Sequence, residues 1–392
     1  MDFRMLNAKL LPQAADLWDY CFEKKGDPFY EWYFSEYCLK QNSIIGGFDG
    51  DKLACMLHLN PYAIMLRGSE VRLPYIVGVA TAPEYRGQHL TRPMLETAFT
   101  VLRAQGAAFA LLMPINPAIY TPYGFSYCYY RHYYKLPLTE LKSLPPVQNV
   151  KLVRYAEILE GLDAAAKIYS ASGQSLNGMA VRSKAKWQEL LNGYKAEKVM
   201  LAVAVLNDEP VGYMLYSIAG GTFKVQEMLT LNHEAQNALL HYAAGHLSDA
   251  QDFEWLAEAD NLAHLDFAGA DYCGSVKPFM MARCINIRKA LELLPVPQGL
   301  EGEATLLITD KFLPLNNGLL KIKASGGVLT HASTVDDEEI VMDAAAFTQL
   351  CFGTFGFDEL VRAGKIKVLN PRKSGFMQAL FAKCRNYINE YY

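Results

Sequence analysis

The residues best placed to do chemistry lie where an apolar strand turns into a helix, around Arg86 and Gly87. The strand includes Val77–Thr81, a proline-bearing turn follows, and apolar residues recur at helical spacing from Leu90 onward. Pro93 is compatible with that helix because a missing N–H costs little in the first turn. Unpaired amides and the positive end of the helix dipole would meet at this turn. We therefore predict a helix starting near Arg86-Gly87 and a phosphate or pyrophosphate site; the alternative is a purely structural turn.

The elements around this turn predict a mixed α/β fold. In the first third we expect helices at 14–22 and 29–38, a hairpin turn at 47–51, and strands at 75–81 and 108–113. The middle third repeats this order faintly, with strands at 199–205, 211–218 and 225–231 and a helix at 234–248. This second copy has no Arg-Gly turn between Leu231 and Glu234, so we expect it to lack the phosphate site.

Prolines cluster at 144–149 and at 294–299, after segments that complete a strand or helix pattern. We therefore predict domains at 1–145, 146–293 and 294–392. The last range is predicted to be a compact α+β domain, with strands at 303–309, 318–323 and 327–329 and helices at 344–351 and 375–387.

Composition is that of an ordinary globular protein, with 392 residues, 51% hydrophobic and 20% charged. A net charge of -4 gives no reason to expect nucleic acid or an anionic membrane surface as the main partner. The sequence has no apolar run of about 18 residues and no signal-like start, so we expect a cytoplasmic protein that binds no membrane. The eight cysteines show no CxxC or Cys/His spacing, and we expect neither a metal nor a disulfide framework.

Tyr120 stands four residues before the pair Gly124-Phe125. The order strand, Arg-Gly turn, helix, strand and Tyr-x-x-x-Gly-Phe resembles the GCN5-related N-acetyltransferases (GNAT), which bind acetyl-CoA by its pyrophosphate. The degenerate second copy, and a final lobe with Thr309-Asp310 and 315–318, resemble more narrowly the Eis family, in which a third domain is similar to sterol carrier proteins. The resemblance implies a catalytic GNAT domain, a degenerate GNAT-like domain and a C-terminal SCP2-like α+β domain, the first two being mixed sheets with flanking helices.

Acetyl-CoA as cosubstrate is a further implication of the resemblance. In the family, backbone groups at Val79 and Thr81 bind the pantetheine and the thioester, and a fixed N–H such as that of Val79 would hold the developing oxyanion. The set of cofactor-binding residues that the resemblance implies is Val79, Ala80, Thr81, Arg86, Gly87, Gln88, His89, Leu90, Thr91, Arg92, Ile115 and Asn116. Family members have glycine where this chain has His89, and often a small residue at Thr91. His89 therefore either adopts a conformation that keeps its amide available or weakens the site.

The resemblance also implies the catalytic groups. Tyr120 falls on the position that protonates the departing CoA thiolate; a phenol of pKa about 10 can do this if it is held within hydrogen-bond reach. The other interpretation of Tyr120 is a core tyrosine. In the Eis family the terminal carboxylate, here that of Tyr392, helps to deprotonate the amine, and a carboxylate of pKa about 3.5 would need a water relay or electrostatic assistance. The other interpretation of Tyr392 is a frayed terminus.

The resemblance suggests acetylation of aminoglycosides or other polyamines, and a homo-oligomer that is hexameric in some members. Aromatic and acidic residues of the early helices would line the substrate pocket, since carboxylates attract polyamines and aromatic faces hold cations. The candidates are Phe22, Asp27, Glu31 and Trp32, each of which is equally compatible with an ordinary amphipathic helix.

Two other functions stay open. In the first, the chain is a binding protein that keeps the fold and holds some other ligand, because His89 and Thr91 have removed its affinity for CoA. Alternatively, the chain transfers a longer acyl group, or its final lobe binds lipid.

Overall fold

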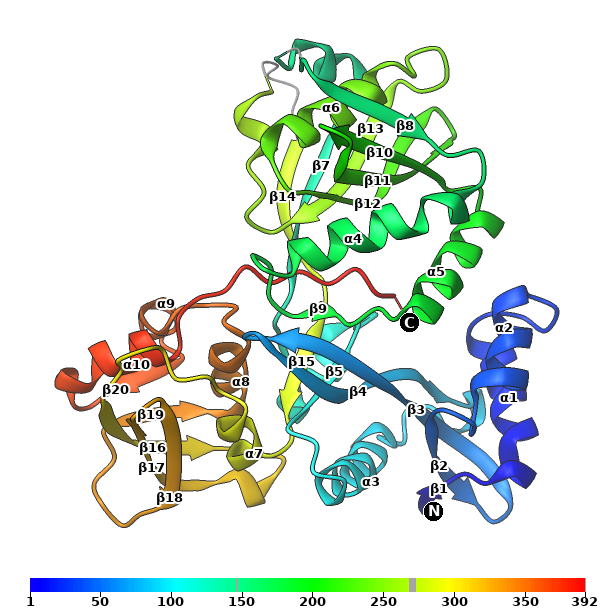
Figure 1. The fold of residues 1–392 in the computed structure, drawn as a ribbon. Coiled ribbons are helices and arrows are strands. Elements are labelled where there is room, and N and C mark those ends of the chain that lie inside the picture. Colours follow the sequence, from blue (N-terminus) through cyan, green and yellow to red (C-terminus); the bar gives the residue numbers. More distant parts are fainter. Residues whose placement is uncertain (146, 268–272, 392) are drawn as a thin grey trace. The chain divides into compact units, whose positions relative to one another are not determined.

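The computed structural model describes residues 1–145, 147–267 and 273–391, and contacts divide the chain into two compact units (Figure 1). The first unit comprises Met1–Cys128 and Phe279–Cys384, and the chain returns to it from Glu390. The second unit comprises Tyr129–Pro278 with Arg385–Asn389. Each unit therefore combines segments that lie far apart in the sequence. No helix among the described residues is long and apolar enough to cross a membrane.

A mixed sheet forms the N-terminal part of the first unit, with its strands in the order β1-β2-β3-β4-β5-β15-β6. The strands are β1 (Asp2–Met5), β2 (Ser43–Asp49), β3 (Lys52–Leu66), β4 (Ser69–Thr81), β5 (Phe109–Leu112), β15 (Met281–Cys284) and β6 (Ser126–Tyr127). Neighbouring strands are antiparallel except β4 and β5, which run parallel on either side of a helical crossover. The hairpin and both strands predicted here are confirmed.

Helices cover both faces of this sheet. They are α1 (Leu11–Cys21), α2 (Pro28–Trp32), which continues as a π-helix over Tyr33–Tyr37, and α3 (Thr91–Ala104). Side chains alternate along a strand, and Leu57 and Leu59 of β3 pack in one apolar cluster with Phe99 of α3. His58, between them, instead contacts the Trp18 ring of α1, with ring centroids 5.0 Å apart. Thus α1 and α3 lie on opposite faces.

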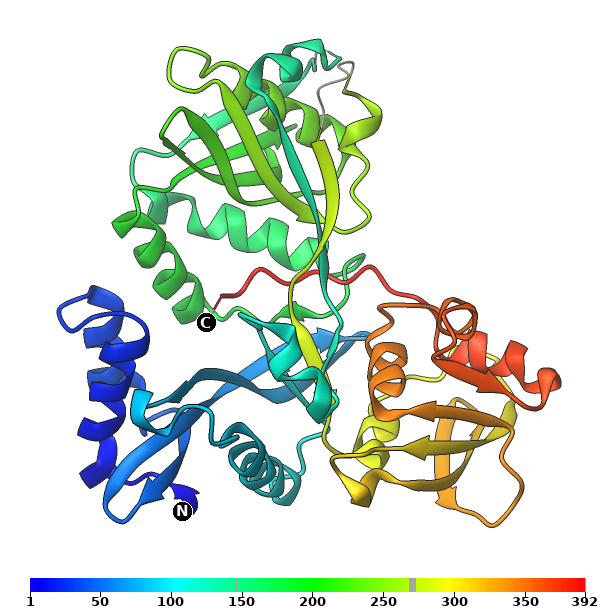
Figure 2. The same ribbon diagram turned by 180° about the vertical axis from the view of Figure 1, so that it is seen from behind.

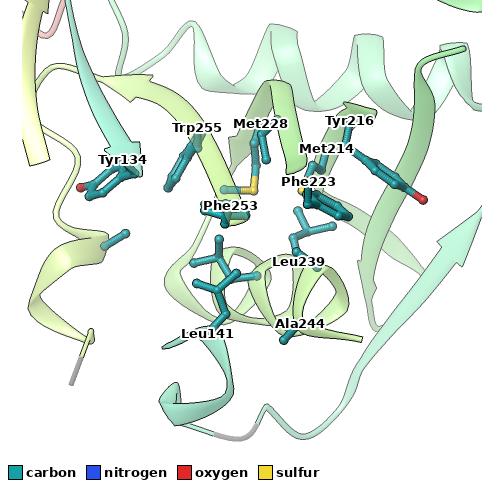
Figure 3. Close-up of a cluster of buried hydrophobic side chains, with 14 of the residues drawn as sticks. Tyr134, Leu141, Met214, Tyr216, Phe223, Met228, Leu239, Ala244, Phe253 and Trp255 are labelled. Carbon is teal, nitrogen blue, oxygen red and sulfur yellow. The ribbon is translucent and has the colours of Figure 1, made fainter. Parts of the chain in front are cut away.

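The second unit repeats this architecture. Its strands β8 (Val150–Arg154), β10 (Met200–Leu206), β11 (Glu209–Ala219), β12 (Thr222–Thr230), β13 (Asp252–Glu258), β7 (Tyr130–Pro137) and β14 (Cys273–Pro278) form a sheet in the order β14-β7-β13-β12-β11-β10-β8. Its helices are α4 (Leu162–Ser172), α5 (Lys184–Ala196) and α6 (His233–Ala244). β12 and β13 are parallel on either side of α6, as β4 and β5 are around α3. The predicted second copy is confirmed, and Figure 3 shows the apolar core between its sheet and α6, which includes Phe223, Leu239 and Trp255.

The two copies exchange strands near their junctions. β7 follows the first copy in sequence but pairs with β13 and β14 of the second unit. β15 follows the second copy but pairs with β5 and β6 of the first unit. Strand pairing thus moves residues 129–145 from the first predicted range into the second unit.

The C-terminal part of the first unit is a separate α+β layer (Figure 2). Its sheet has the order β18-β17-β16-β19-β20, with β16 (Gly302–Thr309), β17 (Gly318–Ser325), β18 (Val328–Ser333), β19 (Ile340–Asp343) and β20 (Ile366–Val368). Its helices are α7 (Ile287–Glu292), α8 (Ala344–Phe352), α9 (Phe357–Arg362) and α10 (Ser374–Leu380). The helix predicted at 375–387 was wrong beyond Leu380, because Tyr387 donates its amide to the Asn177 carbonyl rather than to a helical partner.

Candidate active site

A β-bulge interrupts β4 near its carboxyl end. The register between β3 and β4 shifts so that Leu57 alone faces both Gly78 and Val79. Gly78 has φ +58°, and a Cβ built on it would stand 2.3 Å from the Trp18 ring and 3.2 Å from His58. Only glycine fits this position, and the bulge turns the strand where the thioester is expected to bind.

Just before the bulge, β4 diverges from β5. The two parallel strands pair only at Tyr75 with Leu111 and at Ile76 with Leu112. No strand of the described chain pairs with that edge of β4 along Val77–Thr81. The divergence leaves backbone N–H and C=O groups of a strand edge available to an extended ligand.

The turn after β4 contains two left-handed residues, Gly87 with φ +79° and His89 with φ +56°. A histidine tolerates this conformation at a cost of about 1–2 kcal/mol, whereas glycine adopts it freely. His89 therefore holds the backbone conformation that a glycine would hold. The sequence left open whether His89 keeps its amide available or weakens the site. The structure supports the first outcome, because His89 adopts the backbone conformation of a glycine.

Amides of this turn have no internal partner. Those of Gly87, Gln88, His89 and Leu90 donate no hydrogen bond to any group of the described chain, and α3 has no side-chain N-cap. The helix begins at Thr91, so the start predicted near Arg86-Gly87 was wrong: left-handed residues cannot continue a right-handed helix. A loop of exposed amides followed by a helix N-terminus is suited to an anion.

The corresponding helix of the second unit differs at the same place. The Asn232 side chain caps α6 by accepting the Ala235 amide at 2.8 Å, and Glu234 places a negative charge in the first turn. Side-chain capping and an acidic residue both disfavour an anion there. The N-terminus of α3 is therefore suited to an anion, whereas that of α6 is already capped by its own side chain.

Two arginines flank the turn in the first unit. Arg86 donates through Nε to the Thr81 carbonyl at 3.2 Å, and its side chain is exposed. Arg92 forms an exposed ion pair with Glu96, with Nε and Oε1 3.0 Å apart. Both guanidinium groups stay accessible to solvent, where they add positive charge to the amide loop.

Tyr120 lies between two short 3-10 helices and is 9% exposed. Its ring packs edge-on against Phe125, with centroids 6.0 Å apart. Burial raises the pKa of Tyr120 to about 12, and its hydroxyl bonds to no other group of the described residues. The phenol therefore stays protonated at neutral pH and has a proton to give.

Gly124 explains the Gly-Phe pair that follows Tyr120. It has φ +82°, and a Cβ built on it would stand 2.4 Å from Nη1 of Arg283. Arg283 is fully buried and pairs with Asp310, with Nη2 and Oδ2 2.6 Å apart. Asp310 also accepts the Phe312 and Leu313 amides, so this ion pair joins the C-terminal layer to the loop that carries Tyr120.

The last described residues of the chain lie on β3 and β4. Tyr62 donates its hydroxyl to the Glu390 carboxylate at 2.7 Å, and Tyr75 donates to the Tyr391 carbonyl at 3.1 Å. Tyr75 belongs to the same β4 segment that pairs with β5 before the divergence. Tyr392 itself lies outside the described residues.

Comparison with known proteins explains this arrangement. Residues 2–128 and residues 178–284 each match a family described as an acetyltransferase (GNAT) domain, and residues 287–389 match a sterol carrier protein domain. The chain therefore carries two acetyltransferase (GNAT) domains followed by a sterol carrier protein domain. The types of the three domains expected from the resemblance are therefore confirmed.

Several proteins are similar to this GNAT protein over its length. An uncharacterized N-acetyltransferase of Streptomyces avermitilis is 22% identical over 83% of each chain. A probable N-acyltransferase of unknown function from Enterococcus faecalis has a TM-score of 0.88 and 22% identity over 100% of each chain. Eis1 from Mycobacterium abscessus has a TM-score of 0.77 and 17% identity over 100% of each chain. These structures share the fold.

The proposed substrate residues of the GNAT protein have local partners. The Asp27 carboxylate accepts the Lys24 amide at 3.0 Å, and that of Glu31 accepts the Gly26 amide at 2.9 Å. Phe22 packs against Trp18, Trp32 packs against Phe29 and Tyr37, and Tyr33 contacts both Trp18 and Trp32, so these rings form one aromatic group. The structure gives Asp27 and Glu31 a role in shaping their loop, and their contact with a substrate stays a prediction.

Of the remaining predicted cofactor residues, Ile115 and Asn116 follow β5, and Ala80 lies on β4. Ile115 is 91% exposed, and its contact with a cofactor stays a prediction. Asn116 caps the next 3-10 helix by accepting the Ala118 amide at 3.0 Å. Ala80 is buried beside the bulge.

Sequence reasoning missed a buried polar cluster beneath the bulge. Tyr33 hydrogen-bonds to His58 Nδ1 and to Asn60, each at 3.0 Å, and Asn42 donates to Tyr33 and Asn60. Burial lowers the pKa of His58 to about 3, so the imidazole is neutral. Two polar residues at alternate positions of an otherwise apolar strand, His58 and Asn60, were the available signal.

Proposed function

We propose that this GNAT protein transfers an acetyl group from acetyl-CoA to a primary amine of a polyamine or aminoglycoside-like molecule. The observation that carries the proposal is the turn after β4, where His89 keeps a left-handed backbone and the amides of residues 87–90 have no internal partner. Such amides, at the start of α3, match the oxygens of a pyrophosphate.

The divergence of β4 and β5 supports the position of the thioester. Pantetheine amides would pair with the open edge of β4 at Val79 and Thr81, as a strand adds to a sheet edge. The N–H of Val79 would then donate to the thioester oxygen as it becomes negative. The bulge at Gly78 supports this role, because it turns the strand just before Val79.

The reaction proposed is direct attack. The amine nitrogen bonds to the thioester carbon, the carbonyl oxygen becomes an oxyanion, and the C–S bond breaks as the carbonyl re-forms. Tyr120 gives its proton to the departing thiolate, and the attacking nitrogen, positively charged once it has bonded, loses a proton that returns to the phenol through water. The amine must first lose a proton, and the terminal carboxylate of Tyr392 would assist through water. The contacts of Glu390 and Tyr391 with Tyr62 and Tyr75 support a terminus held against the catalytic sheet.

Calorimetric titration with acetyl-CoA tests this proposal. Micromolar binding to the unmodified protein would support it, and a following search through polyamines and aminoglycosides would identify the amine. No binding, restored by His89→Gly, would mean that the chain keeps the fold without the cosubstrate. Competition among acyl-CoA chain lengths distinguishes acetyl transfer from transfer of a longer group. Cytoplasmic location and a hexameric assembly stay predictions from sequence and resemblance.

A further inference from the structure

The second unit reproduces the bulged strand and the strand divergence of the first. The β11–β12 register shifts so that Gln226 of β12 is the extra residue. β12 pairs with β13 only as far as Val225 and Trp255, although β13 continues to Glu258. The edge of β12 is therefore unpaired with β13 beyond Val225. The edge of β4 is likewise unpaired with β5 beyond Ile76.

In the second unit this place is filled by the chain's own C-terminal segment. Asn389 donates through Nδ2 to the Gln226 carbonyl, at the bulge, at 3.2 Å. Arg131 of β7 donates to the Ile388 carbonyl and to Asn389, and Arg385 pairs with Asp260 just after β13. Segment 385–389 therefore contacts β12, the neighbouring strand β7 and the residues just after β13.

A buried charged group anchors the middle of the segment. Arg182 binds the Glu227 carboxylate through two hydrogen bonds of 2.8 and 2.9 Å, and both side chains are at most 1% exposed. Tyr213 and Tyr387 donate to the same carboxylate at 2.8 and 3.2 Å. Burial alone would raise the pKa of Glu227, but Arg182, Tyr213 and Asn389 hold it below its usual value. An anion with four donors is fully compensated, and Tyr387 supplies one of them.

Backbone pairing adds to the anchor. The Asn177 amide donates to the Arg385 carbonyl at 2.8 Å, and the Tyr387 amide donates to the Asn177 carbonyl at 2.9 Å. Tyr387, Ile388 and Asn389 are each at most 3% exposed. Ion pairs, backbone hydrogen bonds and burial of its side chains therefore all hold the segment.

From these contacts we infer that the degenerate GNAT copy is a binding site for segment 385–389. The gap between its diverging strands binds this peptide at the place where the first copy is proposed to bind acetyl-CoA. The residues that follow, Glu390 and Tyr391, contact Tyr62 and Tyr75 of the first unit. Anchoring at 385–389 would therefore position the terminus for the first copy's reaction. This second step rests on the proposed function; the binding site itself does not.

The double variant Tyr387→Phe with Asn389→Ala tests the binding site. It removes the hydrogen bonds to Glu227 and Gln226 and the one from Arg131 to Asn389, but it keeps the Arg182–Glu227 pair and the bond from Arg131 to the Ile388 carbonyl, so the unit should still fold. Hydrogen exchange of the amides in 385–389 should become about tenfold faster or more. Tyr216→Phe is the matched control, because it also removes one buried hydroxyl, bonded to Tyr242 at 2.6 Å. Unchanged exchange in the double variant would overturn the binding site.

Steady-state kinetics test the positioning step. In the double variant kcat/KM for the amine should fall about tenfold or more, while the Kd for acetyl-CoA stays within about twofold. Faster exchange with unchanged kinetics would overturn positioning and leave the binding site. An unmodified protein that neither binds nor uses acetyl-CoA would overturn the proposed function, and the exchange result would still decide the binding site.

Discussion

The glycine of the Gly-Phe pair, Gly124, lies directly against the buried guanidinium of Arg283, 2.4 Å from where its Cβ would stand. Gly124→Ala should therefore destabilise the protein by more than about 2 kcal/mol, since it combines a left-handed backbone with displacement of a buried ion pair. Gly106→Ala is the control: φ is +78°, with nothing within 4 Å, so only the conformational cost of about 1–2 kcal/mol applies. If urea unfolding shows the same loss of unfolding free energy for Gly124→Ala and Gly106→Ala, the Arg283 contact is excluded as the cause.

The backbone of His89, rather than its imidazole, should determine acetyl-CoA affinity. His89→Val should raise the Kd about tenfold or more, because a β-branched residue is strongly disfavoured at φ +56°. His89→Gly should keep the Kd within about threefold. Lys198→Val, at φ +59° in the second unit, controls for general strain and should leave binding unchanged. Normal binding by the valine variant, measured by calorimetry, would mean that the amide is not used.

Tyr120→Phe should lower kcat about a hundredfold and leave acetyl-CoA affinity unchanged, because the phenol acts only as the thiolate departs. Its pKa of about 12 predicts no loss of the acid by ionisation below about pH 11. Tyr123→Phe, three residues away and packed on Phe312, is the control and should retain full turnover. A Tyr120 variant with normal kcat would remove this residue from the mechanism.

The buried imidazole of His58 should make stability fall in acid. Its folded pKa of about 3 lies below the usual 6.5, so between these values only the unfolded chain binds the proton. Unfolding free energy should therefore fall as pH falls through this window, by about 1.4 kcal/mol per pH unit from this group. His58→Gln should flatten the slope between about pH 5 and 6.5, whereas Asn42→Ala should lower stability without changing the slope. Parallel curves for wild type and His58→Gln would contradict this origin.

Local patterns sufficed for much of the fold. Strands β4, β5, β10 to β12 and β16 to β18, the hairpin at Gly47–Asp51 and the amphipathic helix after the Arg-Gly turn were predicted, because each depends on neighbours a few residues apart. The spacing of Tyr120 to Gly124 was visible for the same reason. The helix start and the helix predicted at 375–387 failed where a left-handed residue or a distant partner decided the backbone.

By itself, the sequence indicated the domain types and a candidate acid through the family resemblance that its motifs carry. Local periodicity placed a turn suited to phosphate between an apolar strand and an amphipathic helix. Only the tertiary structure decided that His89 is left-handed, that His58 is neutral, and that β7 and β15 exchange sheets. It alone brought segment 385–389 to Glu227. The neutral imidazole of His58 depends on burial. The strand exchange and the binding of segment 385–389 depend on contacts between residues more than a hundred positions apart, and one-dimensional patterns do not specify which distant strand edge a segment will fill.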